Sequence, residues 1–384
     1  MRTFAAFSGS RDNNFNLLRF IAAFMVIVSH SFLLSIGTSA VKPFGQSFSI
    51  GLGTVGVFIF FTTSGYLIAM SYCNRHDLAA FLIARGLRIF PAICVCSLLS
   101  AFILGPWMSS LGIVDYFKDL SVYKYAINNS WLFHRRETLP GVFVSNPYPR
   151  EFNGSLWTLP IELRCYMLVA AIGVVGLFRR RRIVSILLLA SLIMIVIACR
   201  WGGFTTPVWI LPAFFLSGVL FYINRDLVPT NGLIGLGLGM GAALAYRTML
   251  LPILAGSFLV YAVFWFAYVP DGWIRKYNDL GDYSYGLYIY AFPVQQTLAA
   301  LRPGIAPLPM FLAAFPLVAG LAVVSWHVVE KPSLALKERI GTFSLFNWRW
   351  KAANAATSEQ SIAGKALNNR IIDNPASLAE LPPQ

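Results

Sequence analysis

Four ionisable residues, Arg19, His30, Glu162 and Arg164, stand inside long apolar stretches of the sequence. An ionised side chain in the middle of a membrane helix costs about 2.5–3.5 kcal/mol on insertion scales, so such residues usually serve a function. Arg19 and His30 share one predicted helix and lie close to three full turns apart, which places both side chains on one face, about 16 Å apart along the axis. A guanidinium at one depth and an imidazole at another predict a polar path along that face.

Glu162 stands in the first turn of another predicted helix, in the segment 157–162, and we expect it at about the depth of His30. A histidine and a carboxylate at one depth suit general-base catalysis on a hydroxyl group. Simpler roles stay open for all of these groups. Arg19 can extend to the membrane interface, His30 can serve packing, and Glu162 can cap its helix or pair with Arg164.

Arg85 and Arg88 stand three residues apart ahead of a predicted span, so one helical face would present both guanidinium groups. Guanidinium forks match phosphate groups, which makes the pair a candidate phosphate site. Basic residues that merely flank a membrane span would give the same pattern. Ser64 and Gly65 lie within the second predicted span, where the glycine would admit a ligand to the backbone or would let two helices pack closely.

The elements that carry these residues are predicted membrane helices. Hydrophobic residues make up 57% of the 384-residue chain and charged residues only 12%, about half the usual charged fraction of a soluble domain. A membrane-spanning helix needs about 20 apolar residues. Ten stretches approach this length, namely 15–36, 51–71, 89–105, 157–178, 183–200, 205–222, 232–246, 249–269, 280–300 and 306–328. We therefore expect an all-α, polytopic membrane helix bundle over residues 1–340, with an ordered loop at about 106–156 and a disordered tail over 341–384.

The formal net charge of +14 fits membrane topology better than nucleic-acid binding, because the basic residues lie between the apolar runs. They concentrate in alternate connections, which by the positive-inside bias places both termini in the cytoplasm. Both termini on one side require an even number of spans, so ten is expected and eight is the alternative. Cys94 and Cys96 have no histidine at metal-ligand spacing, and we expect no metal site and no nucleic-acid partner.

Six motifs in a fixed order carry a family resemblance. They are Arg19 through His30, Gly56 through Ile68, Arg85 through Pro91, Trp157 through Glu162, Gly281 through Tyr288, and Glu330 through Pro332. In this order and spacing the chain resembles the acyltransferase-3 family of membrane O-acyltransferases over about residues 13–332. Two positions depart from the family pattern: Phe58 stands where members often carry an acidic residue, and Tyr290-Ala291 stands where many carry a histidine. His30 is then the strongest candidate base within a span, with His327 a weaker one.

The resemblance implies a multi-pass enzyme of the bacterial cytoplasmic (inner) membrane that moves an acyl group, most often acetyl from cytoplasmic acetyl-CoA, to a carbohydrate hydroxyl. It implies binding of the acyl-CoA donor by Arg19, Arg85, Arg88, Ser64 and Gly65. His30 would act as the general base, and Glu162 would orient its imidazole or contact the sugar. Trp157 and Tyr285 are the residues expected to contact the carbohydrate acceptor.

Two other classes of protein share part of this pattern. A transporter or flippase that moves a glycan or a small acid would also combine many helices with buried charges. Inverted repeats would favour transport, and the sequence shows no convincing internal symmetry. A non-catalytic membrane scaffold would leave the buried ionisable residues unexplained. The acceptor stays open among exopolysaccharide, lipopolysaccharide, a signalling oligosaccharide and peptidoglycan.

Overall fold

The computed structural model describes residues 2–8, 12–37, 51–75, 77–132, 134, 136–201, 207–246, 248 and 250–340. Within these residues every regular element is a helix, and extended pairing is limited to two isolated bridges. The predicted disordered tail over 341–384 lies outside the described residues.

Eleven helices form the body of the bundle in the described part of the chain. They are α1 (Phe15–Ile36), α3 (Leu52–Arg75), α4 (Leu78–Leu99), α8 (Leu159–Val174), α9 (Arg181–Trp201), α10 (Pro207–Ile223), α11 (Gly232–Leu244), α12 (Leu251–Tyr268), α13 (Ser284–Leu301), α14 (Pro307–Ser325) and α15 (Lys331–Ile340). Shorter elements join them, namely η1 (Phe4–Ala6), η2 (Ser100–Leu104), α5 (Gly105–Met108), α6 (Ile113–Lys118), α7 (Leu120–Trp131), η3 (Gly154–Thr158), η4 (Leu177–Arg179), η5 (Gly272–Asp279) and η6 (Trp326–Glu330).

A helix lies at each of the ten predicted spans, and the fold is a polytopic helical bundle, as predicted. Six helices of the described residues are long and apolar enough to cross a membrane. They are Phe15–Ile36, Leu52–Asn74, Leu78–Met108, Gly154–Val174, Leu251–Tyr268 and Pro307–Leu336. The number of spans and the cytoplasmic placement of the termini stay predictions.

The third span begins earlier than the sequence suggested. Its helix α4 starts at Leu78 rather than near residue 89, and the Asp77 side chain caps it by accepting a hydrogen bond from the backbone N–H of Ala80 at 3.0 Å. Arg85 and Arg88 therefore lie inside the helix and not ahead of it. The two arginines made this part of the helix look like an interfacial flank, although Arg88 is neutralised inside the bundle.

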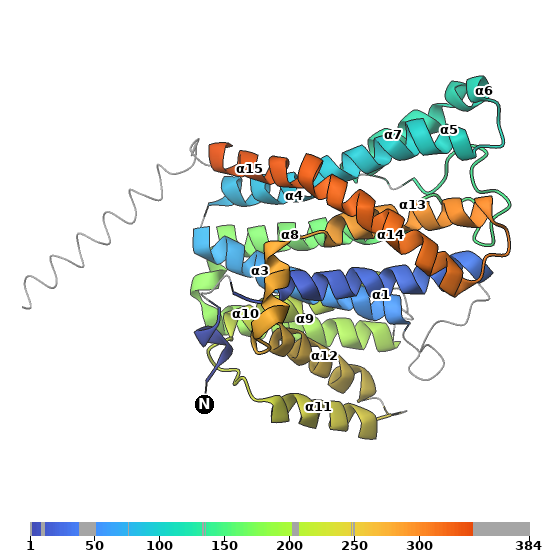
Figure 1. Cartoon of the computed structure of the whole chain (residues 1–384). Helices are drawn as coiled ribbons and strands as arrows, with labels where there is room; N and C mark the ends of the chain where they lie inside the picture. Colours follow the sequence, from blue (N-terminus) through green and yellow to red (C-terminus); the bar gives the residue numbers. More distant parts are fainter. Residues whose placement is uncertain are drawn as a thin grey trace, which may run out of the picture.

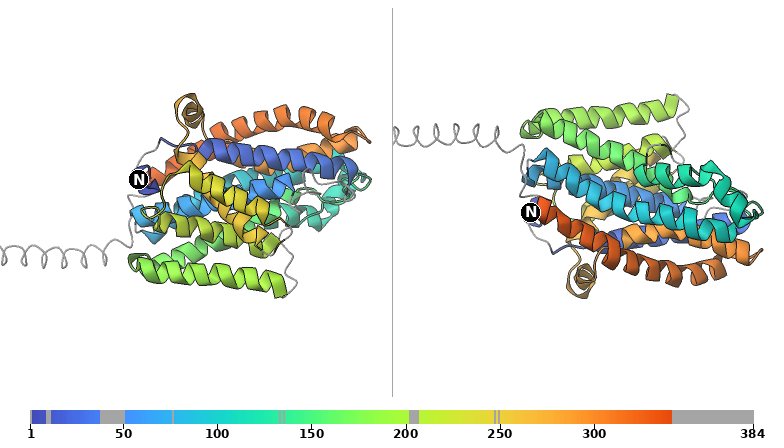
Figure 2. Two further views of the ribbon diagram at one scale, coloured as in Figure 1. Left: turned by 90° about the horizontal axis from the view of Figure 1, so that it is seen from below. Right: turned by 90° about the horizontal axis from the view of Figure 1, so that it is seen from above.

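The helices lie roughly parallel to one long axis of the molecule (Figure 1). Helix α1 packs between α3 and α13, with α14 on a further side, while α11 and α12 form a peripheral pair (Figure 2). Helices α3, α4 and α15 extend further toward the left of Figure 1 than the starts of α1 and α13. The starts of these two central helices are therefore recessed relative to the ends of α3, α4 and α15.

The predicted loop at 106–156 is ordered and folds back on the bundle. Helix α7 returns along α4, so that the rings of Phe90 and Trp131 lie 5.8 Å apart. A small apolar core that includes Tyr116, Tyr125 and Phe152 holds this segment together. The chain then enters the bundle, where the Asn153 side chain donates to the carbonyl of Ile289 at 2.8 Å. Helix α8 consequently begins well inside the molecule.

Two glycines let α3 and α10 touch through their backbones. A Cβ atom on Gly65 would lie 1.9 Å from the carbonyl oxygen of Phe215, and one on Gly218 would lie 2.1 Å from the carbonyl oxygen of Thr62. Of the two roles considered for Gly65, close helix packing accounts for its position. Its missing side chain faces α10, and a bound ligand has no room there.

Replacement of Gly65 by alanine should therefore destabilise the bundle, because the new methyl group collides with main-chain atoms that cannot rotate away. Overpacking of this kind costs about 1–3 kcal/mol. Gly237→Ala on α11 is the matched control, since a Cβ there meets nothing within 4 Å. The melting temperature of the detergent-purified protein should fall for Gly65→Ala alone. Equal melting temperatures of the two variants would contradict the close backbone contact of α3 and α10.

Candidate active site

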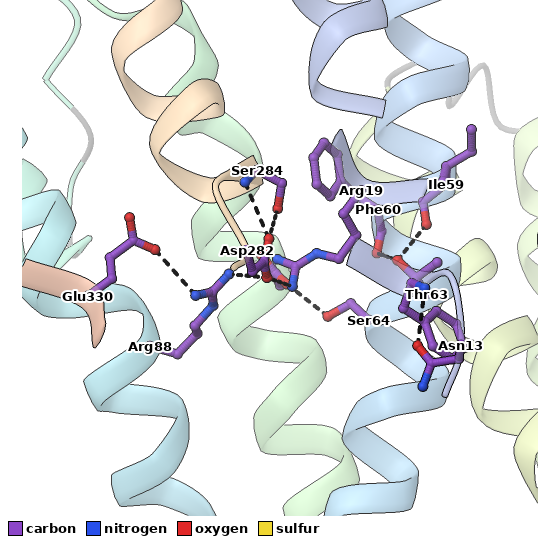
Figure 3. Close-up of polar contacts among 12 residues, drawn as sticks. Asn13, Arg19, Ile59, Phe60, Thr63, Ser64, Arg88, Asp282, Ser284 and Glu330 are labelled. Atoms are coloured by element: carbon purple, nitrogen blue, oxygen red, sulfur yellow. Dashed lines mark hydrogen bonds and ion pairs between the residues drawn. The ribbon is translucent and has the colours of Figure 1, made fainter. Parts of the chain in front are cut away.

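Four charged side chains meet at the recessed starts of α1 and α13 (Figure 3). Asp282 immediately precedes α13 and uses one carboxylate oxygen to accept hydrogen bonds from Ser284. Its other oxygen, Oδ2, accepts from Arg19 of α1 and from Arg88 of α4, each at 2.5 Å. One carboxylate thus joins two guanidinium groups from different helices.

A second carboxylate completes the group. Arg88 uses another guanidinium nitrogen to donate to Glu330 at 3.2 Å, and Glu330 is only 1% exposed. The Ser325 hydroxyl donates to the remaining Glu330 oxygen at 3.1 Å. Two positive and two negative side chains balance, which offsets much of the cost of burying each one. We call Arg19, Arg88, Asp282 and Glu330 the charge network.

Sequence reasoning found half of the charge network. Arg19 and Arg88 were expected to hold the phosphates of a donor, whereas Asp282 and Glu330 were noted only as parts of motifs. The signal was available, because buried arginines in an apolar helix require nearby carboxylates. Asp282 lies at the start of the predicted span 280–300, and Glu330 lies just after the predicted span 306–328.

A cavity lies beside Arg19 and holds about 430 Å³ of space, part of which is open to solvent. It is lined by residues of α1, α3, α8, α13 and η3, namely Arg19, Val57, Phe60, Phe61, Ser64, Thr158, Leu159, Glu162, Tyr285 and Tyr288. Four predicted site residues, Arg19, Ser64, Glu162 and Tyr285, therefore share one cavity. Trp157 is not among the lining residues and packs against the hydrophobic core instead.

Glu162 forms a polar cluster with two hydroxyl groups on the cavity wall. Its Oε1 atom accepts from the Ser64 hydroxyl at 2.8 Å and from the Tyr166 hydroxyl at 2.5 Å. These bonds replace the pairing with Arg164 considered above. The expected depth was also wrong: Glu162 lines the cavity with Arg19 and not the region of His30, because α8 begins deep inside the bundle.

Arg85 and Arg88 differ in their surroundings although both lie on α4. The Arg88 guanidinium is held by Asp282 and Glu330. Arg85 lies about one turn closer to the start of α4 and makes no hydrogen bond or ion pair with the described residues, and its buried Nε lacks a partner there. It is close enough to the Glu162 cluster for the two charges to interact. One of the two predicted phosphate ligands is therefore occupied within the described structure, and the other is free.

His30 lies farther along α1, outside the cavity lining. Its ring meets the Phe292 ring edge to face with centroids 5.1 Å apart, and its buried Nδ1 has no hydrogen-bond partner among the described residues. Between Arg19 and His30 the helix buries the apolar Ala23 and Ile27. The expected continuous polar path is therefore wrong for this conformation.

One face of α13 connects the two regions. Tyr285 and Tyr288 line the cavity, and Phe292, one turn further, touches His30. Residues at this spacing share a helical face. The cavity and the imidazole are consequently neighbours along α13, with the Phe292 ring beside His30 at the next turn.

The described residues contain no group of three or more histidine, cysteine, aspartate or glutamate side chains arranged to hold a metal ion.

Comparison with known proteins agrees with this architecture. The family model described as an acyltransferase domain matches residues 12–327. An O-acetyl transferase of Shigella phage Sf6 is 32% identical over 346 residues, covering 84% of this chain and 96% of the phage protein. Nodulation protein 10 of Rhizobium leguminosarum bv. viciae is 26% identical over 368 residues, covering 86% of this chain and 95% of that protein. No solved structure matches the chain.

These matches, the apolar helices and the cavity lined by Arg19 and Glu162 together define an acyltransferase embedded in a membrane. The match spans every helix that contributes to the cavity. The chain belongs to the acyltransferase-3 family, as the six motifs predicted. It is a membrane O-acyltransferase, and the transporter and scaffold interpretations are set aside.

The charge network should be required for stability. In Asp282→Asn the two arginines lose their shared anion, and breaking a buried ion pair costs about 3–5 kcal/mol. We expect a clear drop in the melting temperature of the purified protein together with loss of activity.

Asp226→Asn provides the matched control. Its partner Arg181 donates at 2.5 Å and holds the pKa of the Asp226 carboxyl below its ordinary value, but both side chains are largely exposed, at 36% and 49%. Exposed pairs contribute about 0–1 kcal/mol. Similar melting temperatures for the two variants would show that the network is not a structural requirement.

Proposed function

We propose that this enzyme transfers an acetyl group from cytoplasmic acetyl-CoA to a hydroxyl of an exported or cell-surface carbohydrate, in the inner membrane of a bacterium. The family supports the transfer of an acyl group, and the name of the phage relative supports acetyl. The observation that carries the proposal is the face of α13 that runs from the polar cavity to His30.

Arg85 is the group best suited to hold donor phosphates. Acetyl-CoA carries its negative charges on a nucleotide end that a guanidinium fork can bind. Arg19 and Arg88 already neutralise Asp282 and Glu330, whereas Arg85 has no ion-pair partner among the described residues. A phosphate at Arg85 would supply the missing negative charge. The basic connections predicted for this end of the bundle would favour approach from the cytoplasm.

The cavity suits the narrow end of the donor. The largely uncharged pantetheine arm with its thioester is the part of the donor narrow enough for this site, and the cavity would widen to admit it, since the space open to a water-sized sphere is about 40 Å³. The Ser64 and Tyr288 hydroxyls on its wall offer hydrogen bonds to the amide groups of the arm. With phosphates at Arg85, the arm would extend along α13 toward Phe292 and His30.

In the proposed reaction the His30 imidazole accepts the proton of the acceptor hydroxyl. The sugar oxygen then attacks the carbonyl carbon of the thioester, the carbon–sulfur bond breaks, and the ester and the CoA thiolate are the products. Glu162 has a different role from the one first expected: bonded to Ser64 and Tyr166, it shapes the cavity wall. Displacement of the Phe292 ring would bring the thioester to the imidazole.

Replacement of His30 by alanine should abolish transfer while leaving the protein folded, since a general base contributes about 10²–10⁴-fold to such a rate. Mass spectrometry of surface glycans should show loss of the acetyl increment. His327→Ala is the control, because its exposed ring lies beside Tyr283, ahead of α13, whereas His30 contacts Phe292. Normal acetylation by His30→Ala would remove this residue from the mechanism.

Replacement of Arg85 by glutamine should raise the KM for acetyl-CoA by about tenfold or more, because charged hydrogen bonds contribute about 1.5–3 kcal/mol. The activity with acetyl-pantetheine, which lacks the nucleotide phosphates, should not change.

Arg180→Gln, an exposed arginine of the connection before α9, should leave both activities unchanged. An unaltered KM for acetyl-CoA in Arg85→Gln would refute the phosphate role. An equal loss with both donors would indicate a general structural defect instead.

A further inference from the structure

Gln295 is fully buried on α13, and the structure uses only half of its amide. The amide nitrogen donates to the carbonyl of Ile27 at 2.9 Å and to the Ser31 hydroxyl at 2.7 Å. The amide oxygen, Oε1, has no hydrogen-bond partner among the described residues. Buried polar atoms are nearly always paired in proteins, so an unpaired one requires an explanation.

The orientation of this amide is set by its neighbours. A backbone carbonyl can only accept a hydrogen bond, so the atom that faces Ile27 must be the nitrogen. The Ser31 hydroxyl donates its own proton to the same Ile27 carbonyl at 3.0 Å, and it therefore accepts from Gln295. The oxygen is consequently the end of the amide that is left free.

The second unpaired atom of this region is Nδ1 of His30. Ile27 and Ser31, the two contacts of Gln295, flank His30 on α1. Phe292, which lies one turn before Gln295 on α13, touches the His30 ring. The two helices thus bring an unpaired acceptor and an unpaired imidazole nitrogen to the same level of their interface.

We propose that Gln295 is the positioning residue of His30: both atoms are unpaired in the conformation described here, and a rotation of the imidazole brings Nδ1–H to Oε1 of Gln295, which accepts its hydrogen bond. With the proton fixed on Nδ1, the lone pair of the neutral ring lies on Nε2, which is the nitrogen that must accept the proton of the acceptor hydroxyl. Partners of this kind fix the tautomer and the ring orientation of functional histidines. The inference rests on the proposed role of His30 as base.

The neighbouring Gln296 shows what a purely structural glutamine looks like in this helix. Its nitrogen donates to the carbonyls of Tyr148 and Glu151, and its oxygen accepts from the Asn146 side chain. Every polar atom of this amide is used, and it attaches the segment before α8 to α13. The unused oxygen of Gln295 is therefore specific to the position that faces α1.

Among the described residues His30 forms no ion pair, and its ring contact is with the apolar Phe292. A neutral acceptor leaves the ring uncharged at rest and able to take a proton. A carboxylate at position 295 would instead favour the imidazolium form. This difference gives a test that packing alone cannot imitate.

The test compares Gln295→Leu, Gln295→Glu, Ser31→Ala and His30→Ala in the full-length protein, purified and reconstituted in lipid vesicles. Acetyl transfer is measured against pH, with melting temperature as a check on folding. Gln295→Leu should lower kcat by about 10–100-fold with the KM for acetyl-CoA unchanged, as for other residues that orient functional imidazoles. Gln295→Met, an unbranched apolar variant, replaces Gln295→Leu if the latter does not fold.

Gln295→Glu should retain more activity than Gln295→Leu, and the acid limb of its pH–rate profile should move by about one unit or more to higher pH. Ser31→Ala, which removes a partner of the amide nitrogen and leaves Oε1 in place, should keep the wild-type profile. The inference would be overturned by an unshifted pH–rate profile in Gln295→Glu together with equal losses of activity in Gln295→Leu, Gln295→Glu and Ser31→Ala. Retained activity in His30→Ala would instead refute the base itself, so the two failures are distinguishable.

Discussion

The bundle depends on the shared contact of Arg19 and Arg88 with Asp282. Arginine inside an apolar helix is costly unless a carboxylate is placed against it. Here the carboxylate is that of Asp282, which precedes α13. One contact therefore fixes the relative depth of α1, α4 and α13. Glu330 extends it to the end of α14. The cavity lies beside this contact, with Arg19 on its wall.

The same contact divides three arginines that look alike in sequence. Arg19 and Arg88 hold the helices in place, and Arg19 also presents one side to the cavity. Arg85 belongs to the same helix as Arg88, yet no carboxylate is assigned to it in the described structure. A difference of less than one helical turn thus separates a structural guanidinium from one that can bind a ligand, and it depends on which carboxylates other parts of the chain deliver.

The sequence was sufficient for the fold class and for the family, because apolar length and ordered motifs are local properties. It located Arg19, Ser64, Glu162 and Tyr285, which share the cavity. It failed for quantities that depend on tertiary contacts. The depth of Glu162 follows from the way the preceding segment enters the bundle. The start of α4 was obscured by Arg88, whose partners lie 194 and 242 residues further along the chain. The half-used amide of Gln295 has no signature in one dimension.

The contact between α3 and α10 limits how this enzyme can move. Main-chain atoms of the two helices are separated by no side chain at Gly65 and Gly218, so neither helix can slide or roll past the other without a backbone collision. The pair is therefore a rigid part of the bundle. In the proposed reaction, the widening that lets a thioester pass would come from α1 and α13, which meet through side chains that can rotate. The side chain of Phe292, whose ring contacts the His30 imidazole, is a group of this kind.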